Sequence, residues 1–360
     1  MSLGIFLASG DSFKNMAKSG QDELFKKFYL SFFAKNFTRV YIFSYANEKV
    51  NGLPKNIVVV PNKYNLHRYI YGFLMPLLNI KAVKNCDVMR VYHLFGTPPA
   101  IVAKFFFGKP FIFNYAYDYK KFAQIEGKFF QTILFTLLES VAILFSWKIF
   151  AANKAIFKKL PRNKAVYLPN GVDTNFFKPA KSKKRNEIPV ILSVGRLENQ
   201  KNFEILIMAM KGVNAKLLIV GQGSQKEKLE KLAKENNVDL KIVNKVENTK
   251  MPQIYNQADV FVLPSLAEGS PKVLLEAMAC GLPVIGSQVI GIGEVINNGV
   301  DGLFCNTDSK SISSSIYRLL SNSKLRGKLA TNARDTVFRE YDLANFIQKE
   351  IKVLKNNKNQ

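Results

Sequence analysis

Short apolar runs alternate with longer segments of helical periodicity along the 360-residue chain, which predicts βα units with parallel sheets. In the first half we expect strands at 3–9, 39–44, 57–60, 87–93, 111–115, 148–152 and 165–168. In the second half we expect them at 190–194, 216–220, 241–243, 260–263 and 284–286. The main helices are expected at 21–35, 129–145, 203–211, 225–236, 253–257 and 271–280. The pattern indicates an α/β protein with two Rossmann-like halves, whose ligands bind at the carboxyl ends of the strands.

The length of the chain suits two domains better than one core. We expect an N-terminal domain over 1–170, a linker over 171–189 and a C-terminal domain over 190–340. The tail from 311 to 355 is helical in pattern, with a break near 340–342. Three widely separated cysteines, Cys86, Cys280 and Cys305, lack metal-type spacing and are interpreted as buried apolar residues in a reducing compartment.

The longest apolar run covers 129–150 and contains Gln131, Glu139 and Lys148. A carboxylate at the centre of a membrane span costs about 2.5–3.5 kcal/mol. We therefore interpret the run as a buried helix followed by a strand, and a membrane span is the weaker alternative. No basic-then-apolar signal segment is recognised, because 3–8 fits a buried first strand.

Two carboxylates eight residues apart, Glu268 and Glu276, flank a predicted helix start. Ser270 fits an N-cap, and Pro271 fits the first helical position because its missing N–H has no partner there in any case. Gly281 supplies a left-handed stop. The amide groups at a helix start attract phosphate, so this stretch suits a sugar joined to a nucleoside diphosphate.

This stretch resembles the signature of the family 4 retaining glycosyltransferases of GT-B fold. Other segments occur in the same order as in that family, namely Pro169-Asn-Gly-Val-Asp173, Ser193-Val-Gly195-Arg196-Leu197 with Lys201 and Asn202, Val220-Gly-Gln-Gly-Ser224, Val260-Phe-Val-Leu-Pro264-Ser265 and Gly291-Ile-Gly-Glu294. The resemblance is close from 165 to 305 and loose in the N-terminal half. It implies two Rossmann-like domains facing across a cleft, with a last helix at about 342–358 returning to the first domain.

Arg196 and Lys201 follow a predicted strand end, where two cations could clamp a diphosphate without a metal. Surface ion-pair residues are the alternative interpretation. The resemblance implies that Glu268 lies near the transferred sugar and that Glu276 accepts the ribose hydroxyls. We assign catalytic roles to Glu268, Arg196 and Lys201. The predicted donor-binding set is Gly195, Arg196, Lys201, Val246, Glu268, Gly269, Ser270, Lys272, Val273 and Glu276.

The N-terminal half is expected to bind the acceptor. Candidate residues there are Gly10, Asp11, Gly20, His93, Tyr117 and Asp118. For Gly20, a simple turn is the alternative to a close approach to the donor phosphate. The family usually has a His six residues after the proline at 110, and this chain has Ala116 there. The difference leaves the sugar and the activity open, with Tyr117 and Asp118 as substitutes.

Basic and aromatic residues are concentrated in the first half. Residues 1–180 hold 25 Lys and Arg against 9 Asp and Glu, and 36 of the 44 aromatic residues. Segments 25–35 and 104–109 interleave the two types, which is typical of surfaces that lie on anionic lipid headgroups. The alternative is that the rings are core residues in a compositionally biased chain. Nucleic acid is less favoured because no matching motif is present.

We therefore expect a metal-independent, retaining glycosyltransferase that uses a UDP- or GDP-sugar. Its acceptor would be a glycan or a lipid-linked molecule at the cytoplasmic membrane face, in surface polysaccharide or glycolipid synthesis. A nucleotide-sugar epimerase or hydrolase of the same fold is one alternative. A catalytically silent module that binds membrane or nucleic acid is the other.

Overall fold

The computed structural model describes residues 1–18, 21–116, 118–125, 127–182, 186–244 and 246–356. The chain divides into two compact units. Unit 1 comprises Met1–Pro169 with Phe346–Gln360, and unit 2 comprises Asn170–Asn345. Each unit is a parallel sheet covered by helices on both faces, in agreement with the α/β prediction.

The sheet of unit 1 has seven parallel strands in the order β3-β2-β1-β4-β5-β6-β7. The strands are β1 (Ser2–Phe6), β2 (Arg39–Phe43), β3 (Ile57–Val60), β4 (Val88–Val91), β5 (Phe111–Tyr115), β6 (Lys148–Ala151) and β7 (Ala165–Tyr167). Strands β2 and β3 lie to one side of β1, and β4 to β7 lie to the other. All seven were predicted, with ends that differ by up to three residues.

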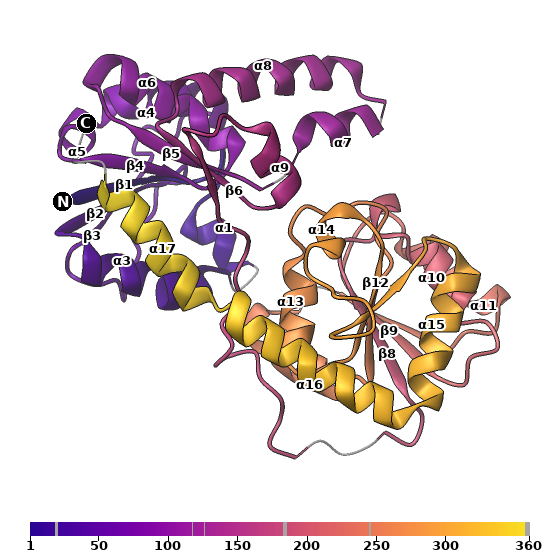
Figure 1. Cartoon of the computed structure of the whole chain (residues 1–360). Coiled ribbons are helices and arrows are strands. Elements are labelled where there is room, and N and C mark those ends of the chain that lie inside the picture. Colours follow the sequence, from indigo (N-terminus) through magenta and orange to yellow (C-terminus); the bar gives the residue numbers. More distant parts are fainter. Residues whose placement is uncertain (19–20, 117, 126, 183–185, 245, 357–360) are drawn as a thin grey trace. The chain divides into compact units, whose positions relative to one another are not determined.

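The helices of unit 1 lie on both faces of this sheet. They are α1 (Phe13–Ala17), α2 (Gln21–Leu24), the π-helical η1 (Phe25–Leu30), α3 (Ser31–Asn36), α4 (Arg68–Leu78), α5 (Ile80–Lys84), the short η2 (Leu94–Gly96), α6 (Thr97–Phe107), α7 (Tyr119–Ile125), α8 (Phe129–Phe145) and α9 (Lys154–Lys159). Figure 1 shows α4, α6 and α8 on one face, with α1 and α3 on the other.

The predicted helix over 21–35 forms, but its middle is the π-helical η1. Its aromatic residues pack within the unit, because Phe25 and Tyr29 both contact the ring of Tyr92 edge-on. Phe33 is fully buried. This basic aromatic segment therefore contributes to the core, as the alternative interpretation held.

Helix α8 forms where the apolar run predicted it, but the expectation that it is buried is wrong. Its only fully buried residue is Ala142, whereas Phe130 is 84% exposed and Leu144 is 65% exposed. One stripe of the helix, including Leu138 and Ile143, packs against the core, and the opposite stripe is left uncovered. Among the described residues, no helix has the length and hydropathy needed to span a bilayer.

The sheet of unit 2 has six parallel strands in the order β10-β9-β8-β11-β12-β13. They are β8 (Val190–Val194), β9 (Lys216–Val220), β10 (Leu240–Val243), β11 (Val260–Leu263), β12 (Val284–Ser287) and β13 (Leu303–Cys305). The edge strand β13 was not predicted, and it is identified by its pairing with β12.

The helices of unit 2 are η3 (Asn199–Lys201), α10 (Phe203–Ala209), α11 (Lys226–Glu235), η4 (Asn248–Lys250), α12 (Met251–Gln257), α13 (Lys272–Ala279), α14 (Ile290–Gly293), α15 (Ser309–Ser321) and α16 (Ser323–Glu340). Figure 1 shows α10, α11 and α15 on one face of the sheet, with α13 and α16 on the other. All three cysteines are buried and unpaired, as predicted.

The last helix, α17 (Leu343–Lys355), begins after the predicted break and returns to unit 1 from Phe346 onward. A buried ion pair fixes it there, with Arg90 Nε 2.5 Å from Glu350 Oε1. The guanidinium of Arg90 also lies over the rings of Tyr92 and Phe150. The charge on β4 therefore holds the returning helix against the sheet.

Candidate functional site

The strand order of unit 2 changes direction between β8 and β11. Strands β9 and β10 lie beyond β8 on one side, while β12 and β13 lie beyond β11 on the other. The loops that leave these two neighbouring strands therefore diverge, and such a point is where open α/β sheets bind ligands. One loop carries Arg196 and Lys201, and the other carries Glu268.

Glycines allow the turn after β8 to pack tightly. A Cβ on Gly221 would lie 1.8 Å from the carbonyl oxygen of Gly195, so only glycine lets the turns after β8 and β9 meet. A Cβ on Gly195 would lie 3.0 Å from Cε of Lys201. The absence of a side chain at Gly195 thus provides the space through which the Lys201 side chain extends. Asn202 ends the turn in the left-handed conformation, with φ of 58°.

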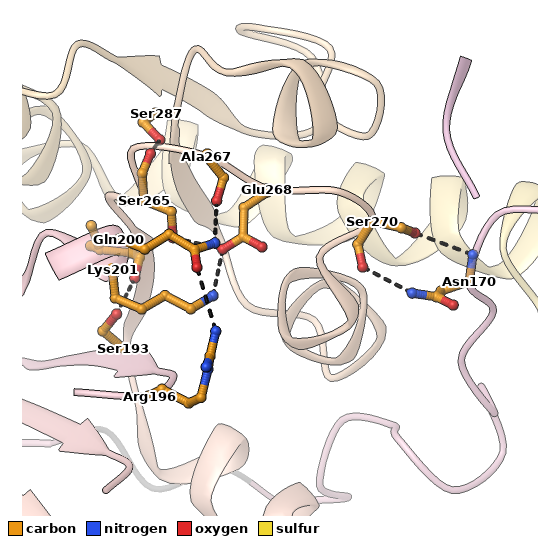
Figure 2. A network of polar contacts seen from close by, with 11 residues as sticks. Asn170, Ser193, Arg196, Gln200, Lys201, Ser265, Ala267, Glu268, Ser270 and Ser287 are labelled. Atoms are coloured by element: carbon orange, nitrogen blue, oxygen red, sulfur yellow. Dashed lines mark hydrogen bonds and ion pairs between the residues drawn. The ribbon is translucent and has the colours of Figure 1, made fainter. Parts of the chain in front are cut away.

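The side chain of Lys201 reaches across the switch point to Glu268, where its Nζ lies 2.5 Å from Oε1 (Figure 2). The same carboxylate oxygen accepts a hydrogen bond of 2.7 Å from Ser265 Oγ. Ser265 itself is buried, and its carbonyl accepts from Ser287 Oγ. Both side chains of the ion pair are mostly buried, at 13% and 10% exposure. The structure therefore brings two predicted catalytic residues into direct contact.

Arg196 lies beside this pair and remains exposed. Its Nη2 is 3.5 Å from Gln200 Oε1, at the limit of a hydrogen bond (Figure 2). Gln200 is held in turn, since its side-chain amide donates to the carbonyl of Ala267 at 2.7 Å. The site thus contains two cations: Lys201, which the ion pair with Glu268 fixes, and Arg196, which a long hydrogen bond to Gln200 restrains weakly.

Helix α13 begins two residues later than Ser270, which corrects the predicted N-cap. Pro271 occupies the cap position, and its carbonyl accepts from the amides of Leu274 and Leu275. The Ser270 hydroxyl instead accepts from the backbone amide of Asn170, whose side chain donates back to the Ser270 carbonyl (Figure 2). The Ser270 hydroxyl thus bonds to Asn170, the first residue of unit 2, and Pro271 occupies the cap position of α13. The amides of Lys272 and Val273 belong to the first turn, where helices lack internal acceptors.

Glu276 is buried on α13 at 6% exposure. Tyr255 of α12 donates to its Oε2 at 2.8 Å, and Lys272 Nζ lies 3.9 Å from Oε1. Burial raises the pKa of Glu276, while Lys272 and the Tyr255 hydroxyl act to lower it. Burial and the carboxylate raise the pKa of Tyr255 well above its ordinary value, so the phenol stays a donor. Glu276 is therefore not a solvent-exposed residue of the helix surface.

Of two further predicted donor residues, Gly269 lies in the same loop as Glu268 and Val246 does not. Gly269 follows Glu268 in the chain. A Cβ on Gly291 of α14 would lie 2.6 Å from the carbonyl oxygen of Gly269. The Gly291 segment therefore packs directly on the Glu268–Gly269 backbone. Val246 follows β10, two strands away from β8 in the sheet order. Its predicted contact with a ligand stays a prediction.

In unit 1 the strand order reverses between β1 and β4, and three N-terminal candidates lie at the ends of these strands. Gly10 has φ of 82° in the turn after β1, and Asp11 follows it. Burial and the neighbouring Glu48 raise the pKa of Asp11. A Cβ on Gly96, in the turn after β4, would lie 2.8 Å from the carbonyl oxygen of Leu7, so the two turns touch.

His93 stands at the end of β4. The Tyr119 hydroxyl lies 2.8 Å from its Nδ1, and the ring of Phe95 stacks on it. Burial lowers the pKa of His93, which keeps the imidazole neutral at pH 7. The side chain is therefore a neutral hydrogen-bonding group at the switch point of unit 1.

Asp118 has a structural role. Its Oδ1 accepts from the Lys121 amide in the first turn of α7, and Lys159 pairs with Oδ2 at 3.0 Å. This is the arrangement of a helix cap. Gly20 and Tyr117 lie outside the described residues.

Tyr255 and Glu139 were not predicted as site residues. Ser265 belongs to the segment Val260–Ser265, which occurs in the family order, but it was assigned no role. Tyr255 lies within a short helix and gives no signal. Glu139 of α8 lies beside the Tyr115 hydroxyl at the end of β5, and burial raises its pKa while that hydroxyl acts to lower it. In the sequence Glu139 only interrupts the apolar run. No cluster of three or more His, Cys, Asp or Glu side chains suited to a metal occurs in the described part of the chain.

Comparison with known proteins adds to this geometry. Residues 174–336 match the family model described as glycosyl transferases group 1. An uncharacterized glycosyltransferase from Methanocaldococcus jannaschii is 35% identical over 215 residues, covering 54% of this chain and 55% of that protein. A GDP-mannose-dependent monoacylated alpha-(1-6)-phosphatidylinositol monomannoside mannosyltransferase from Corynebacterium glutamicum is 30% identical over 213 residues, or 51% and 56% of the two chains. The chain thus spans about half the length of the curated relatives it matches.

The structural likeness covers both units. Sucrose-phosphate synthase from Thermosynechococcus elongatus superposes with a TM-score of 0.83 at 18% identity, over 99% of this chain and 98% of the other. At this identity the likeness establishes the fold alone. The chain has the GT-B fold, as the resemblance implied.

Proposed function

We propose that this chain, whose residues 174–336 belong to the group 1 glycosyltransferase family, is a retaining, family 4-type glycosyltransferase. It moves a sugar from a UDP- or GDP-sugar to a glycan or lipid-linked acceptor. The observation that supports this most is the contact between Lys201 and Glu268 at the switch point of unit 2. In this proposal the Lys201 ammonium meets the leaving diphosphate, and the adjacent Glu268 carboxylate meets the transferred sugar.

The chemistry requires neutralising a diphosphate while positive charge develops at the anomeric carbon. In this proposal Lys201 meets the diphosphate, and the exposed Arg196 turns toward it from its 3.5 Å contact with Gln200. The amides of Lys272 and Val273 at the start of α13 add donors and a favourable dipole. Glu268 stabilises the cationic sugar in this scheme. Glu276 is the acceptor for the ribose hydroxyls in this scheme.

Metal independence is part of the proposal, because two cations and a helix start can together balance a diphosphate. It has a direct test. Turnover measured in excess EDTA should equal turnover with added Mg²⁺, and a strict requirement for added metal would contradict this part.

The acceptor is proposed to bind unit 1, where His93 and the Gly10 turn lie at the switch point. A lipid-linked acceptor at the cytoplasmic membrane face, in glycolipid or surface polysaccharide synthesis, is consistent with the basic, aromatic first half. The mannosyltransferase relative is named for a phosphatidylinositol mannoside acceptor. Three reduced cysteines agree with a cytoplasmic site of action.

A thermal-shift screen of nucleotide sugars tests donor use. A ligand at 100 times its Kd adds about 2.7 kcal/mol to stability, which such a screen detects. We expect a UDP- or GDP-sugar to stabilise the chain, whereas stabilisation by none of them would contradict the proposal. Product analysis with the donor alone separates the alternatives, since an epimerase or hydrolase consumes the donor without any acceptor.

A further inference from the structure

Helices α4, α6 and α8 form one layer on a single face of the unit 1 sheet (Figure 1). They belong to the successive connections from β3 to β4, β4 to β5 and β5 to β6, which all run in the same direction across the sheet. Right-handed crossovers place such helices on the same face. The ring of Phe105 on α6 lies 4.8 Å from that of Phe145 on α8, so the layer is continuous.

The outer surface of this layer, which we term the α4–α6–α8 face, is apolar. On α8 the exposed residues Phe130, Leu134, Leu137, Val141 and Leu144 recur at helical spacing along one stripe. Of the 25 large apolar side chains that are exposed in the described part of the chain, 14 lie on these three helices. An apolar concentration of this kind marks an interaction surface, whereas isolated exposed residues do not.

The other two helices continue the surface. On α4 the exposed residues Tyr69, Ile70, Phe73 and Leu77 form a second stripe, and α6 adds Phe105 and Phe106. The aromatic side chains are enriched at the ends of the helices, as at Phe129 and Phe130 of α8. Aromatic rings in such positions favour the boundary between water and acyl chains.

The chain around these helices is strongly basic. Residues 61–164 contain 16 Lys and Arg against 4 Asp and Glu. Exposed cations include Arg68 at the start of α4, Lys81 and Lys84 on α5, and Lys121 on α7. Each Lys or Arg near an anionic bilayer contributes roughly 1 kcal/mol of attraction. An apolar stripe with a basic border fits a negatively charged lipid surface.

We propose that the α4–α6–α8 face binds an anionic lipid bilayer, with the exposed rings in the headgroup region and the flanking lysines on lipid phosphates. This inference deepens the proposed function, because it names the face of unit 1 that meets the membrane. Only the link to a lipid-linked acceptor rests on the proposed function. A second copy of the chain is a poorer occupant, because a self-complementary contact would bring two basic surfaces together. Lipid also tolerates a surface built from separate helical ridges, which a protein partner would have to match in shape.

Vesicle cosedimentation tests the proposal without any measurement of turnover. Vesicles of phosphatidylcholine with about one-third phosphatidylglycerol should bind the wild-type chain at low salt, and pure phosphatidylcholine should bind it far less. The double variant Phe130→Ser/Leu134→Ser should bind the anionic vesicles roughly tenfold less, since it removes two inserted side chains. Lys81→Glu/Lys84→Glu should also reduce binding, most strongly at low salt.

Phe338→Ser is the matched control, because Phe338 is 58% exposed on α16 of unit 2. This variant should bind the vesicles as the wild type does. Equal loss in Phe338→Ser and Phe130→Ser/Leu134→Ser would overturn the proposal, as would absent binding of the wild type at low salt. A concentration-dependent dimer in gel filtration that disappears in Phe130→Ser/Leu134→Ser would also overturn it, by identifying a second copy as the occupant. Calorimetric binding of UDP or GDP to the same variants reports separately on the proposed function.

Discussion

Lys201 Nζ and Glu268 Oε1 lie 2.5 Å apart, although the two residues are 67 positions apart in the sequence. The pair joins the loop after β8 to the loop after β11, so it fixes the geometry of the switch point in unit 2. The ion pair restricts the motion of the lysine side chain. Its charge is therefore positioned before a ligand binds. Preorganised charge of this kind is worth more in a site than a flexible cation.

The first prediction concerns the strength of this pair. A double-mutant cycle with Lys201→Ala and Glu268→Ala, read from urea unfolding, should give a coupling energy of about 0.5–3 kcal/mol, because both side chains are mostly buried. The pair Lys228–Glu204, which is more exposed at 63% and 31%, is the control, and its cycle should give about 0.2–1 kcal/mol. Additive effects at Lys201 and Glu268 would show that the contact is absent in solution.

The second prediction concerns Gly195. In Gly195→Ala the new methyl group meets the flexible stem of Lys201 at about 3 Å, so the lysine must shift while the backbone stays. Affinity for a nucleoside diphosphate should fall with little loss of thermal stability. Gly293→Ala is the matched control, since a Cβ there meets nothing within 4 Å. If the two variants bound UDP or GDP equally well, the space that Gly195 provides for Lys201 would have no role in binding.

The third prediction separates binding from folding at Glu276. Glu276→Ala should weaken donor binding by roughly 1.5–3 kcal/mol, the range for a hydrogen bond to a charged group. Glu276→Gln should also weaken donor binding. It should leave the free energy of unfolding unchanged or raise it, because burial disfavours the charged carboxylate and raises its pKa. Calorimetry and thermal unfolding measure the two effects. Undiminished nucleotide affinity in Glu276→Ala would remove Glu276 from the site.

The fourth prediction is a pH dependence from His93. Burial lowers the pKa of the folded imidazole below its ordinary value of 6.5. As the pH falls below that value, the unfolded chain takes up a proton that the folded chain does not, so the free energy of unfolding falls. His93→Gln should reduce this slope between pH 6.5 and the lowered folded pKa. The same replacement at the exposed His67 serves as the control, and identical slopes in all three proteins would contradict the prediction.

The fifth prediction concerns the return of α17. Glu350→Ala leaves Arg90 buried without its partner, which should cost about 3–5 kcal/mol in the free energy of unfolding of unit 1. Lys355→Ala, which removes an exposed hydrogen bond to Asn36, should cost far less. Denaturant unfolding compares the variants. An effect of Glu350→Ala no larger than that of Lys355→Ala would mean that the buried pair does not anchor the helix.

Most of the sheet architecture follows from the sequence, because buried parallel strands are continuous apolar runs between turn residues. The runs at Ile57–Val60, Phe111–Tyr115 and Val260–Leu263 match the observed strands at both ends. The three-residue strand β13 could not be predicted, since it is identified by pairing with β12 and not by its own pattern. The uncovered face of α8 could not be predicted either, because the few polar residues of this segment do not mark the side of the helix that faces solvent.

At the site, the sequence identified which loops carry the charges but not how the charges pair. That Lys201 and Glu268 touch depends on the adjacency of β8 and β11, which hydrophobic periodicity does not specify. The Ser270 cap failed for the same reason. Its hydroxyl bonds to Asn170, a residue 100 positions away, and a local capping pattern contains no trace of that contact.

Calorimetric titration of UDP and GDP tests the central claim, that a nucleoside diphosphate binds between the turn after β8 and the start of α13. The wild-type chain should bind one of the two, and the double variant Arg196→Ala/Lys201→Ala should bind it at least about tenfold more weakly, as expected for the loss of charge-assisted hydrogen bonds. Binding that the double variant retains in full, or a wild-type chain that binds neither nucleotide, would contradict the account.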